Sequence, residues 1–411
     1  MADTKESAKS KYDPDLQLDE KDARRAFAVC SVVGAVGLAA STAIGLGIDD
    51  GGARLLHSYL VAFMWALSIG LGALWWVLLQ HLVNAKWSTA IRRIGELLAA
   101  NMPLMGILAL PIVIPTLLGS STLYLWADAE RMHADHVLHH KVPYLNTTFF
   151  AIRCVIYFGV WVVLSRFFYT RSLAQDQSGG ERISGKLRSV AAPGMIGLAL
   201  TLTFAAIDFL MSLDPMWFST IFGVYYFAGC VLAVHATLAL VLMWIQRQGR
   251  MLRVVTVDHY HDIGKMMFAF IVFWAYIAFS QFMLIWYANI PEETAWYRER
   301  VIGAWAPVAW GLVICHFVLP FLGLLSRHVK RNRKALAFWA VWILIVHYVD
   351  LYWLVMPHLN PHHPVPHVLD LTCLAGVAGV FLAGAAHRAR ARSLVPIRDP
   401  RLAESLAFEN G

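Results

Sequence analysis

AAIDFLMSLDP (residues 205–215) places one acidic residue, Asp208, inside an apolar run that is otherwise typical of a membrane-spanning helix. HYVDLYWLVMP (residues 347–357) repeats the arrangement, because Asp350 is also followed by a proline seven residues later. A charge at the centre of a bilayer costs roughly 2.5–3.5 kcal/mol on insertion scales, so such a residue usually has a partner or a task. The two stretches predict membrane helices with buried carboxylates in matching positions.

The composition of the whole chain is typical of a polytopic membrane protein. Of its 411 residues, 58% are hydrophobic and 15% are charged, whereas a soluble domain carries about 25% charged residues. The first 25 residues are polar and lack the apolar core of a signal peptide, so we expect them to stay in the cytoplasm. The cysteines form no CxxC or CxxCH motif, which argues against disulfides, haem c and iron–sulfur ligation within the chain. They are Cys30, Cys154, Cys230, Cys315 and Cys373.

The apolar runs predict ten spanning helices, since each span needs about 20 mostly apolar residues. They cover roughly 26–48, 57–82, 97–118, 147–168, 190–213, 217–245, 264–287, 303–325, 336–356 and 368–387. Of the 34 lysines and arginines, 28 fall in the two tails and the even-numbered connections, and only five in the odd-numbered ones. By the positive-inside rule, both termini are predicted to be cytoplasmic. Orientation thus explains the net charge of +7, and no nucleic-acid partner is expected.

An internal repeat organises these spans. IRCVIYFGVWVVLSR (152–166) aligns without gaps with VICHFVLPFLGLLSR (313–327), and the two Asp-x6-Pro segments follow in the same order. We therefore expect an all-α polytopic membrane protein with two parallel-related four-helix bundles (helices 2–5 and 6–9) and two flanking helices. The expected segments are a cytoplasmic N-terminal tail (1–25), helix 1 with an outer loop (26–56), the first bundle (57–213), the second bundle (214–356), an outer loop with helix 10 (357–387) and a basic cytoplasmic C-terminal tail (388–411).

Asp208 has a candidate partner of opposite charge. Arg153 is a basic residue well inside the predicted span 147–168, and it lies at a similar depth from the same outer side. This spacing predicts an ion pair between two neighbouring helices. A proton-relay role for Asp208 near the outer surface is compatible with that pair and stays open.

Asp350 has no such arginine, because the repeat puts Ile314 where the first half has Arg153. It has His347 three residues earlier, on the same face of the helix. Two groups that can both titrate favour a proton path over a static ion pair. The alternative is a polar, hydrogen-bonded pair at a helix interface.

The inner side of the second half carries another polar group. HYHDIGK (259–265) opens helix 7 and contains His261, Asp262 and Lys265. A solvated helix start would explain them, because an acid near a helix N-terminus is favourable. A cytoplasmic proton entry, or a site for another subunit, is the second interpretation.

The remaining histidines are candidate cofactor or metal ligands. His235 and His316 lie at nearly equal depth and could in principle ligate one haem b. The sequence disfavours haem, because most buried membrane histidines only hydrogen-bond across helices. HADHVLHHK (133–141) and NPHHPVPH (360–367) match no closed metal site, so we predict no metal there and expect exposed loops at a partner interface.

Several longer motifs resemble one known family. They are DFLMSLDPMWFSTIFGVYYFAG (208–229), HDIGKMMFAF (261–270), FSQFMLIWYANIPEETAWY (279–297), DLYWLVMP (350–357) and PIRDPRLAESLAFEN (396–410). They resemble the F subunit (ActF) of alternative complex III, a quinol:electron acceptor oxidoreductase, and the resemblance covers nearly the whole chain. That family is similar to the NrfD/PsrC-type membrane subunits, which have two four-helix bundles and two extra helices.

The resemblance implies a subunit of a respiratory complex in the bacterial cytoplasmic (inner) membrane. Its implied partners are multihaem cytochrome c subunits, an iron–sulfur subunit, a sister ten-helix subunit and, in some cases, a terminal oxidase. It further implies a subunit without its own redox centre, which supports quinol oxidation and helps to carry protons. Quinone binding by this chain stays open. The competing classes are a secondary transporter and a haem b membrane cytochrome.

Overall fold

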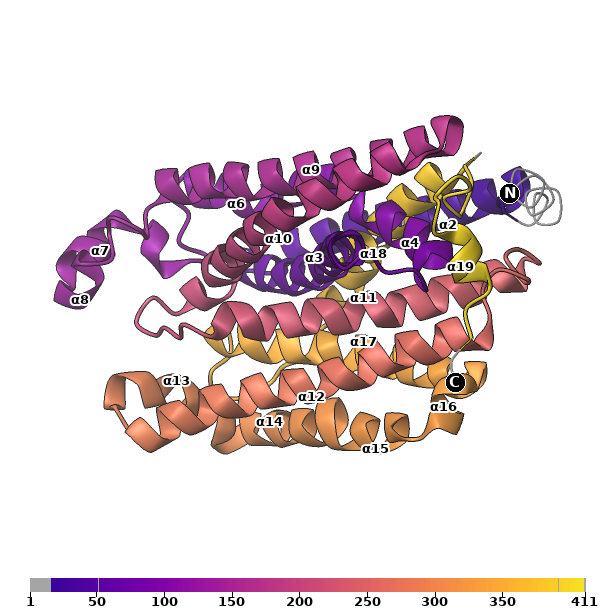
Figure 1. Cartoon of the computed structure of the whole chain (residues 1–411). Helices are drawn as coiled ribbons and strands as arrows, with labels where there is room; N and C mark the ends of the chain where they lie inside the picture. The colour runs from indigo at the N-terminus through magenta and orange to yellow at the C-terminus, as the bar shows by residue number, and fades with distance from the viewer. Residues whose placement is uncertain (1–15, 51, 391, 410–411) are drawn as a thin grey trace.

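The computed structural model describes residues 16–50, 52–390 and 392–409. Residues 1–15 of the predicted N-terminal tail, residue 51 and residues 391, 410 and 411 lie outside the described residues. Within the described ranges, ten helices are long and apolar enough to cross a membrane, and they lie side by side (Figure 1). Helices suit an apolar solvent because each satisfies its own backbone N–H and C=O groups. The prediction of an all-α polytopic membrane protein is confirmed.

The spans follow the chain in order, and several consist of more than one helix. They are α2 (Glu20–Leu46), α3 (Ala53–Leu82), α4–α6 (Thr89–Ala99, Met102–Leu108, Leu110–Leu117), α9 (Thr147–Ser178), α10 with η3 (Glu181–Phe209, Met211–Leu213), α11 (Phe222–Arg247), α12 (Val257–Ala288), η4–α14–η5–α15 (Gly303–Trp305, Ala306–Leu312, Val313–Val318, Leu319–Leu325), α17 with η6 (Arg333–Val355, Met356–His358) and α18 (Val368–Ala389). Short connecting helices are η2 (Leu125–Ala127), α7 (Ala129–Ala134), α8 (His136–His139), α13 (Pro291–Val301), α16 (Arg327–Arg331) and α19 (Leu402–Leu406).

Eight spans form two packed groups. Helices α3, α4–α6, α9 and α10 contact one another, and so do α11, α12, α14–α15 and α17. The groups meet where α3 packs on α11 and α17. In the most apolar 18 residues of α3 and α11, 89% and 83% of the residues are buried, against 17% in α2. The core of the molecule therefore lies along α3 and α11, and the other helices surround them (Figure 1).

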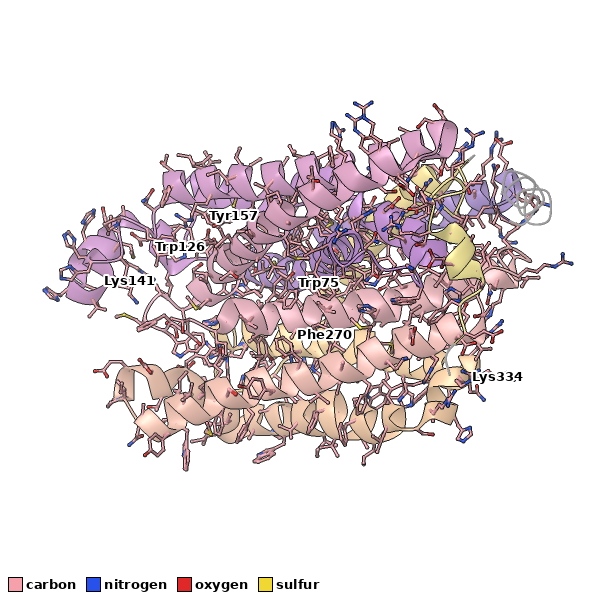
Figure 2. The ribbon with its side chains drawn as sticks, viewed as in Figure 1. Trp75, Trp126, Lys141, Tyr157, Phe270 and Lys334 are labelled. Atoms are coloured by element: carbon pink, nitrogen blue, oxygen red, sulfur yellow. The ribbon has the colours of Figure 1, made fainter. Side chains whose placement is uncertain are left out.

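The two ends of the molecule differ in composition. At one end, which we call the basic end, lie the start of α2, the end of α18, and helices α16 and α19 (Figure 1). At the other, the histidine-rich end, lie α7, α8 and α13 (Figure 1). Lys334 and Lys141 mark these two ends in Figure 2. The alternation of basic connections in the sequence thus corresponds to two physical ends.

The third span departs from its predicted limits. Its helix begins at Thr89 rather than near residue 97, because Arg92, Arg93 and Glu96 are fully or almost fully buried by pairing with each other and with the C-terminal segment. The prolines then divide the span into α4, α5 and α6. A proline ring lacks the N–H that a continuous helix needs at that position, so each break falls at or near a proline.

The C-terminal segment packs against the basic end. The backbone N–H of Leu394 donates to the Leu16 carbonyl at 2.7 Å. Asp399 accepts hydrogen bonds from Arg92 at 2.6 Å and from Arg401 at 2.8 Å. Burial alone would raise the pKa of Asp399, but the two guanidinium groups lower this pKa well below its usual value. The segment is therefore an ionically anchored part of the fold.

Helices α2 and α18 form a close pair at the edge of the first group. An added Cβ at Gly37 would lie 2.5 Å from the backbone nitrogen of Gly376, and one at Gly379 would lie 2.5 Å from that of Gly34. Only glycine allows the two backbones to approach so closely. The first and last spans of the chain thereby become neighbours.

Candidate functional site

Asp350 lies on α17, fully enclosed by the second group, and only neutral donors contact it. The Tyr225 hydroxyl on α11 donates to its Oδ1 atom, and the Trp274 indole N–H on α12 donates to Oδ2 at 3.2 Å. No arginine or lysine pairs with Asp350 among the described residues. Burying an ionised carboxylate without a counter-ion is costly, and binding a proton removes that cost. The geometry therefore suits a carboxyl group that gains and loses a proton.

His316 continues the polar group from Trp274 into the interior. The two ring centroids lie 3.9 Å apart, and neither imidazole nitrogen has a hydrogen-bond partner in the described structure. His316 lies on η5, a π-helical turn (Val313–Val318). Pro320 explains this turn, since it cannot donate to the carbonyl of His316 four residues earlier and its ring would clash with that carbonyl. Such turns often occur at functional sites.

His347 extends the group to the boundary between the two bundles. Its Nε2 atom lies 3.0 Å from the Ser68 hydroxyl on α3, and its ring centroid lies 6.4 Å from that of His316. Gly229 on α11 provides the space, because a Cβ at that position would lie 2.5 Å from the imidazole Cε1 atom. The sequence places His347 and Asp350 on one face of α17, and in the structure the two side chains have different hydrogen-bond partners. Each oxygen of the carboxylate is taken by another donor, and the imidazole turns to Ser68.

Together these side chains form what we call the polar chain. Its members are Tyr225, Asp350, Trp274, His316, His347 and Ser68. They come from α11, α17, α12, η5 and α3, so the chain crosses from the second group to the first. The imidazole centroids lie 6.4 Å apart, and no direct hydrogen bond joins the two rings in the described structure. A water molecule between the rings would be needed to pass a proton there.

Arg300 on α13 contacts the end of the α17 span that lies at the histidine-rich end. It is fully buried, and its guanidinium donates to the Leu354 carbonyl at 3.3 Å and lies 2.8 Å from the His358 imidazole. Its carbon Cζ lies 3.8 Å from the ring centroid of Trp296. Desolvation by burial lowers the pKa of Arg300 to about 9. Leu354 follows Asp350 by one helical turn, so titratable groups continue toward this surface.

Asp208 lies in the first group and has a different environment. Arg153 on α9 donates to both of its carboxylate oxygens, at 2.7 and 2.9 Å, and the Tyr157 hydroxyl donates at 2.7 Å. The guanidinium also lies over the Tyr144 ring, 3.9 Å from its centroid. Figure 2 shows Tyr157 on α9. A bidentate pair of this kind holds its carboxylate charged and fixed.

His261, Asp262 and Lys265 lie at the basic end of α12, as their sequence position requires. Asp262 and Lys265 form an ion pair, and His261 and Asp262 are largely buried. Lys330 packs beside them and donates to the Leu324 carbonyl at 2.7 Å. Twelve residues, or about 18 Å of helix, separate Asp262 from Trp274. The structure therefore does not bring this inner group together with the polar chain.

His235 and His316, the two candidate haem ligands, have different neighbours. His235 lies near Trp75, with 6.5 Å between ring centroids, and its Nδ1 atom lies 2.7 Å from the Val231 carbonyl. His316 contacts Trp274 instead. Trp75 and Phe270 pack between α3 and α12, 5.6 Å apart (Figure 2), and fill the space on the His235 side.

The outer histidines lie on α7 and α8. The His133 and His139 Nδ1 atoms are 3.2 Å apart, and the rings of His136 and His140 are neighbours. Within the described ranges, no group of three or more His, Cys, Asp or Glu side chains is arranged to hold a metal ion. These histidines are exposed at the histidine-rich end, as expected for an outer loop.

Sequence reasoning missed several members of the polar chain. Tyr225 and Trp274 are aromatic residues in apolar helices, where packing is the usual role. Ser68 is one of many small residues in α3. Pro320, aligned with Gly159 in the repeat, was the available signal that helix 8 is irregular near His316.

In the part of the chain that the structure describes, ten spans, eight of them in two packed groups with a buried polar chain between the groups, define a polytopic helical membrane protein. No protein-family model matches the chain, and no curated protein sequence matches it.

Proposed function

We propose that this chain is a membrane subunit, without its own redox centre, of a bacterial quinol:electron acceptor oxidoreductase of the alternative complex III type. Its own contribution is to carry protons that quinol oxidation releases or requires. The polar chain is the observation that supports this role most directly, because it places a carboxyl group and two imidazoles in the apolar interior. Intramembrane ionisable residues commonly mark proton relays. The resemblance of the sequence motifs to the F subunit of alternative complex III supports the type of complex that we propose.

The proton steps use the residues of the polar chain and water molecules between them. A proton reaching His347 passes through a water to His316. A second water carries it on to the Asp350 carboxylate, because His316 has no hydrogen bond to Asp350, and the proton neutralises the carboxylate charge. Tyr225 holds the carboxyl oxygen in place and can exchange its own hydroxyl proton. From Asp350 the proton leaves toward His358 and the histidine-rich end. Each transfer moves a proton between a nitrogen and an oxygen atom, and no residue of the polar chain changes its oxidation state.

The proposal includes an orientation and a set of partners. The basic end faces the cytoplasm, since basic connections are retained on that side. The histidine-rich end then faces outward, where multihaem cytochrome c subunits and an iron–sulfur subunit would dock. A sister ten-helix subunit would oxidise the quinol and pass the electrons to the iron–sulfur subunit. The final acceptor would be cytochrome c or a terminal oxidase.

The first test is a gentle affinity purification of the tagged chain from its native membrane, with partners identified by mass spectrometry. We expect multihaem cytochromes, an iron–sulfur protein and a second ten-helix protein to be retained. Recovery of the chain alone, in a single well-behaved detergent peak, would contradict the complex and would make solute-transport assays the next step. A haem b absorption spectrum from the isolated chain would contradict the absence of a redox centre.

A further inference from the structure

A large cavity lies at the basic end, between the flanking helices and the core. Its volume is about 750 Å³, and α2, α3, α4, α11 and α18 contribute most of its lining. Val29, Trp244 and Leu382 line it and are also exposed on the outer surface of the helices, at 54%, 36% and 38%. The cavity is therefore open toward the lipid. It contains no member of the polar chain.

The length of the cavity corresponds to one leaflet of the bilayer. Its lining on α11 runs from Thr237 to Gln248, and on α18 from Ala378 to Ala389. Eleven residues of helix rise about 16 Å. Half of a hydrocarbon core of about 30 Å is nearly the same length. A hydrocarbon chain that enters the cavity at the basic end and reaches its deep wall would thus lie at the depth of a lipid acyl chain in that leaflet.

The deep part of the cavity offers no hydrogen bond to a ligand. The Trp65 indole N–H donates to the Leu344 carbonyl at 3.0 Å, and the Thr237 hydroxyl donates to the Ala233 carbonyl at 2.8 Å. The other deep lining residues are apolar, apart from the weak thiol donor of Cys30. A quinone head group needs donors for its carbonyl oxygens, and a buried carbonyl without one is costly. These walls fit a hydrocarbon chain.

The mouth of the cavity is polar and carries both signs of charge. Asp22 and Arg25 line it from α2, one turn apart. The neighbouring Arg24 is paired with Glu20 at 2.5 Å, whereas no ion pair to Arg25 occurs in the part of the chain that the structure describes. A guanidinium binds phosphate well, and a carboxylate next to it attracts an ammonium group. The two charges together match a zwitterionic head group.

We infer that this cavity binds one phosphatidylethanolamine molecule from the leaflet at the basic end. One acyl chain fills the apolar wall between α2, α11 and α18. The phosphate lies at Arg25, and the ethanolamine ammonium lies at Asp22. The lipid fills space beside α2, whose most apolar stretch is only 17% buried by protein. This role requires neither a quinol nor a partner subunit, so it stands apart from the proposed function.

The test uses the full chain, purified in mild detergent with whatever partners it retains, and native mass spectrometry during titration with phosphatidylethanolamine. Ala26 lines the cavity and Ala28, on the same helix, does not. We expect Ala26→Trp to fill the cavity and weaken lipid binding at least about tenfold. Ala28→Trp should leave binding unchanged. Equal binding by the two variants would overturn the site.

The head group has its own pair of variants, which also serves if Ala26→Trp fails to fold. Arg25→Gln should weaken phosphatidylethanolamine binding several-fold, whereas Arg24→Gln, one residue away, should not. Asp22→Asn should shift the preference toward phosphatidylglycerol, which has no ammonium group. Arg24 and Arg25 variants of equal effect would contradict the assignment of the phosphate. A quinone as the main small molecule in an organic extract, lost in Ala26→Trp, would replace the phospholipid with a different occupant.

Discussion

The two buried aspartates share one sequence pattern and occupy different environments. Asp208, in the first group, is held by a bidentate arginine and a tyrosine hydroxyl. Asp350, in the second, is held by a tyrosine hydroxyl and an indole N–H, both neutral. Each is followed seven residues later, or about two helical turns, by a proline on the side of the histidine-rich end, so the sequence pattern does not distinguish them. Their partners do.

The comparison teaches that a duplicated carboxylate can acquire two different roles through one residue on a neighbouring helix. The aligned positions are Arg153 in the first half and Ile314 in the second. An arginine lowers the free-energy cost of burying a charged carboxylate in an apolar interior, which favours a fixed structural pair. Without it the carboxylate depends on a proton. The following predictions separate these two roles.

The largest effect is expected from breaking the pair in the first group. Arg153→Leu leaves Asp208 buried and uncompensated, which typically costs about 3–5 kcal/mol of stability. We expect a strongly reduced thermal midpoint and poor recovery in detergent, measured by fluorescence-detected size-exclusion chromatography during heating. The double variant Arg153→Leu/Asp208→Leu should regain much of the loss, since both charges are then absent. A stable single variant would mean that Asp208 does not need its partner.

Asp350, the carboxylate without a cationic partner, should affect turnover more than stability. Asp350→Asn keeps the hydrogen-bonding shape but cannot carry a proton. Positioned proton-transfer groups contribute about 10²–10⁴-fold to rates, and water can replace part of that, so we expect quinol oxidation by the complex to fall at least about tenfold. The thermal midpoint should change little. Asp208→Asn is the matched control, with the reverse outcome: lost stability and little specific loss of turnover per folded complex.

A smaller effect should follow from crowding His347. Gly229→Ala places a methyl group 2.5 Å from the imidazole Cε1 atom, so the ring must move away from Ser68. Overpacking of this kind costs about 1–3 kcal/mol. Proton-coupled turnover should fall together with the thermal midpoint. In the first group, Gly159→Ala meets nothing within 4 Å and should change neither quantity.

The smallest effect at neutral pH is expected for Asp399, a second arginine-paired carboxylate. Because its pKa is lowered on folding, its contribution to stability is complete above the unfolded value of about 3.9. It is lost as the pH falls through the lower, folded value. The hydrogen-exchange protection of residues 393–406, corrected for the pH dependence of intrinsic amide exchange, should therefore be constant between about pH 5 and 8 and fall below about pH 4. Asp399→Asn should show fast exchange at every pH, and an unchanged rate would contradict the anchoring.

The spans were predictable because a bilayer allows few structures, and apolar length and the alternation of basic residues both record them. The repeat also indicated which residues would correspond. The start of α4 was not predictable, since Arg92, Arg93 and Glu96 look like loop residues until their partners from the C-terminal segment are known. A prediction of membrane spans leaves charged residues out, because burying a single charge costs free energy. Pairing with an opposite charge lowers that cost, and the partners are not visible in the local sequence.

The candidate site was only partly predictable. Asp208 and Arg153 lie at similar distances from the outer ends of their predicted spans, which predicted their ion pair. Opposite charges buried in neighbouring spans have few other partners. The direction of the His347 imidazole was not encoded in its three-residue spacing from Asp350. It depends on the space over Gly229 and on the π-helical turn at His316, which lie on two other helices.

The glycine-lined contact between α2 and α18 has a consequence for biosynthesis. A ribosome delivers the first span long before the last, and most of the protein partner of α2 is α18. Until α18 has been inserted, Gly34 and Gly37 of α2 therefore lack the partner helix that covers them in the folded protein. A prematurely terminated product would keep this glycine face exposed. Such a face would distinguish unfinished chains from finished ones, so quality control could recognise truncation at the first helix.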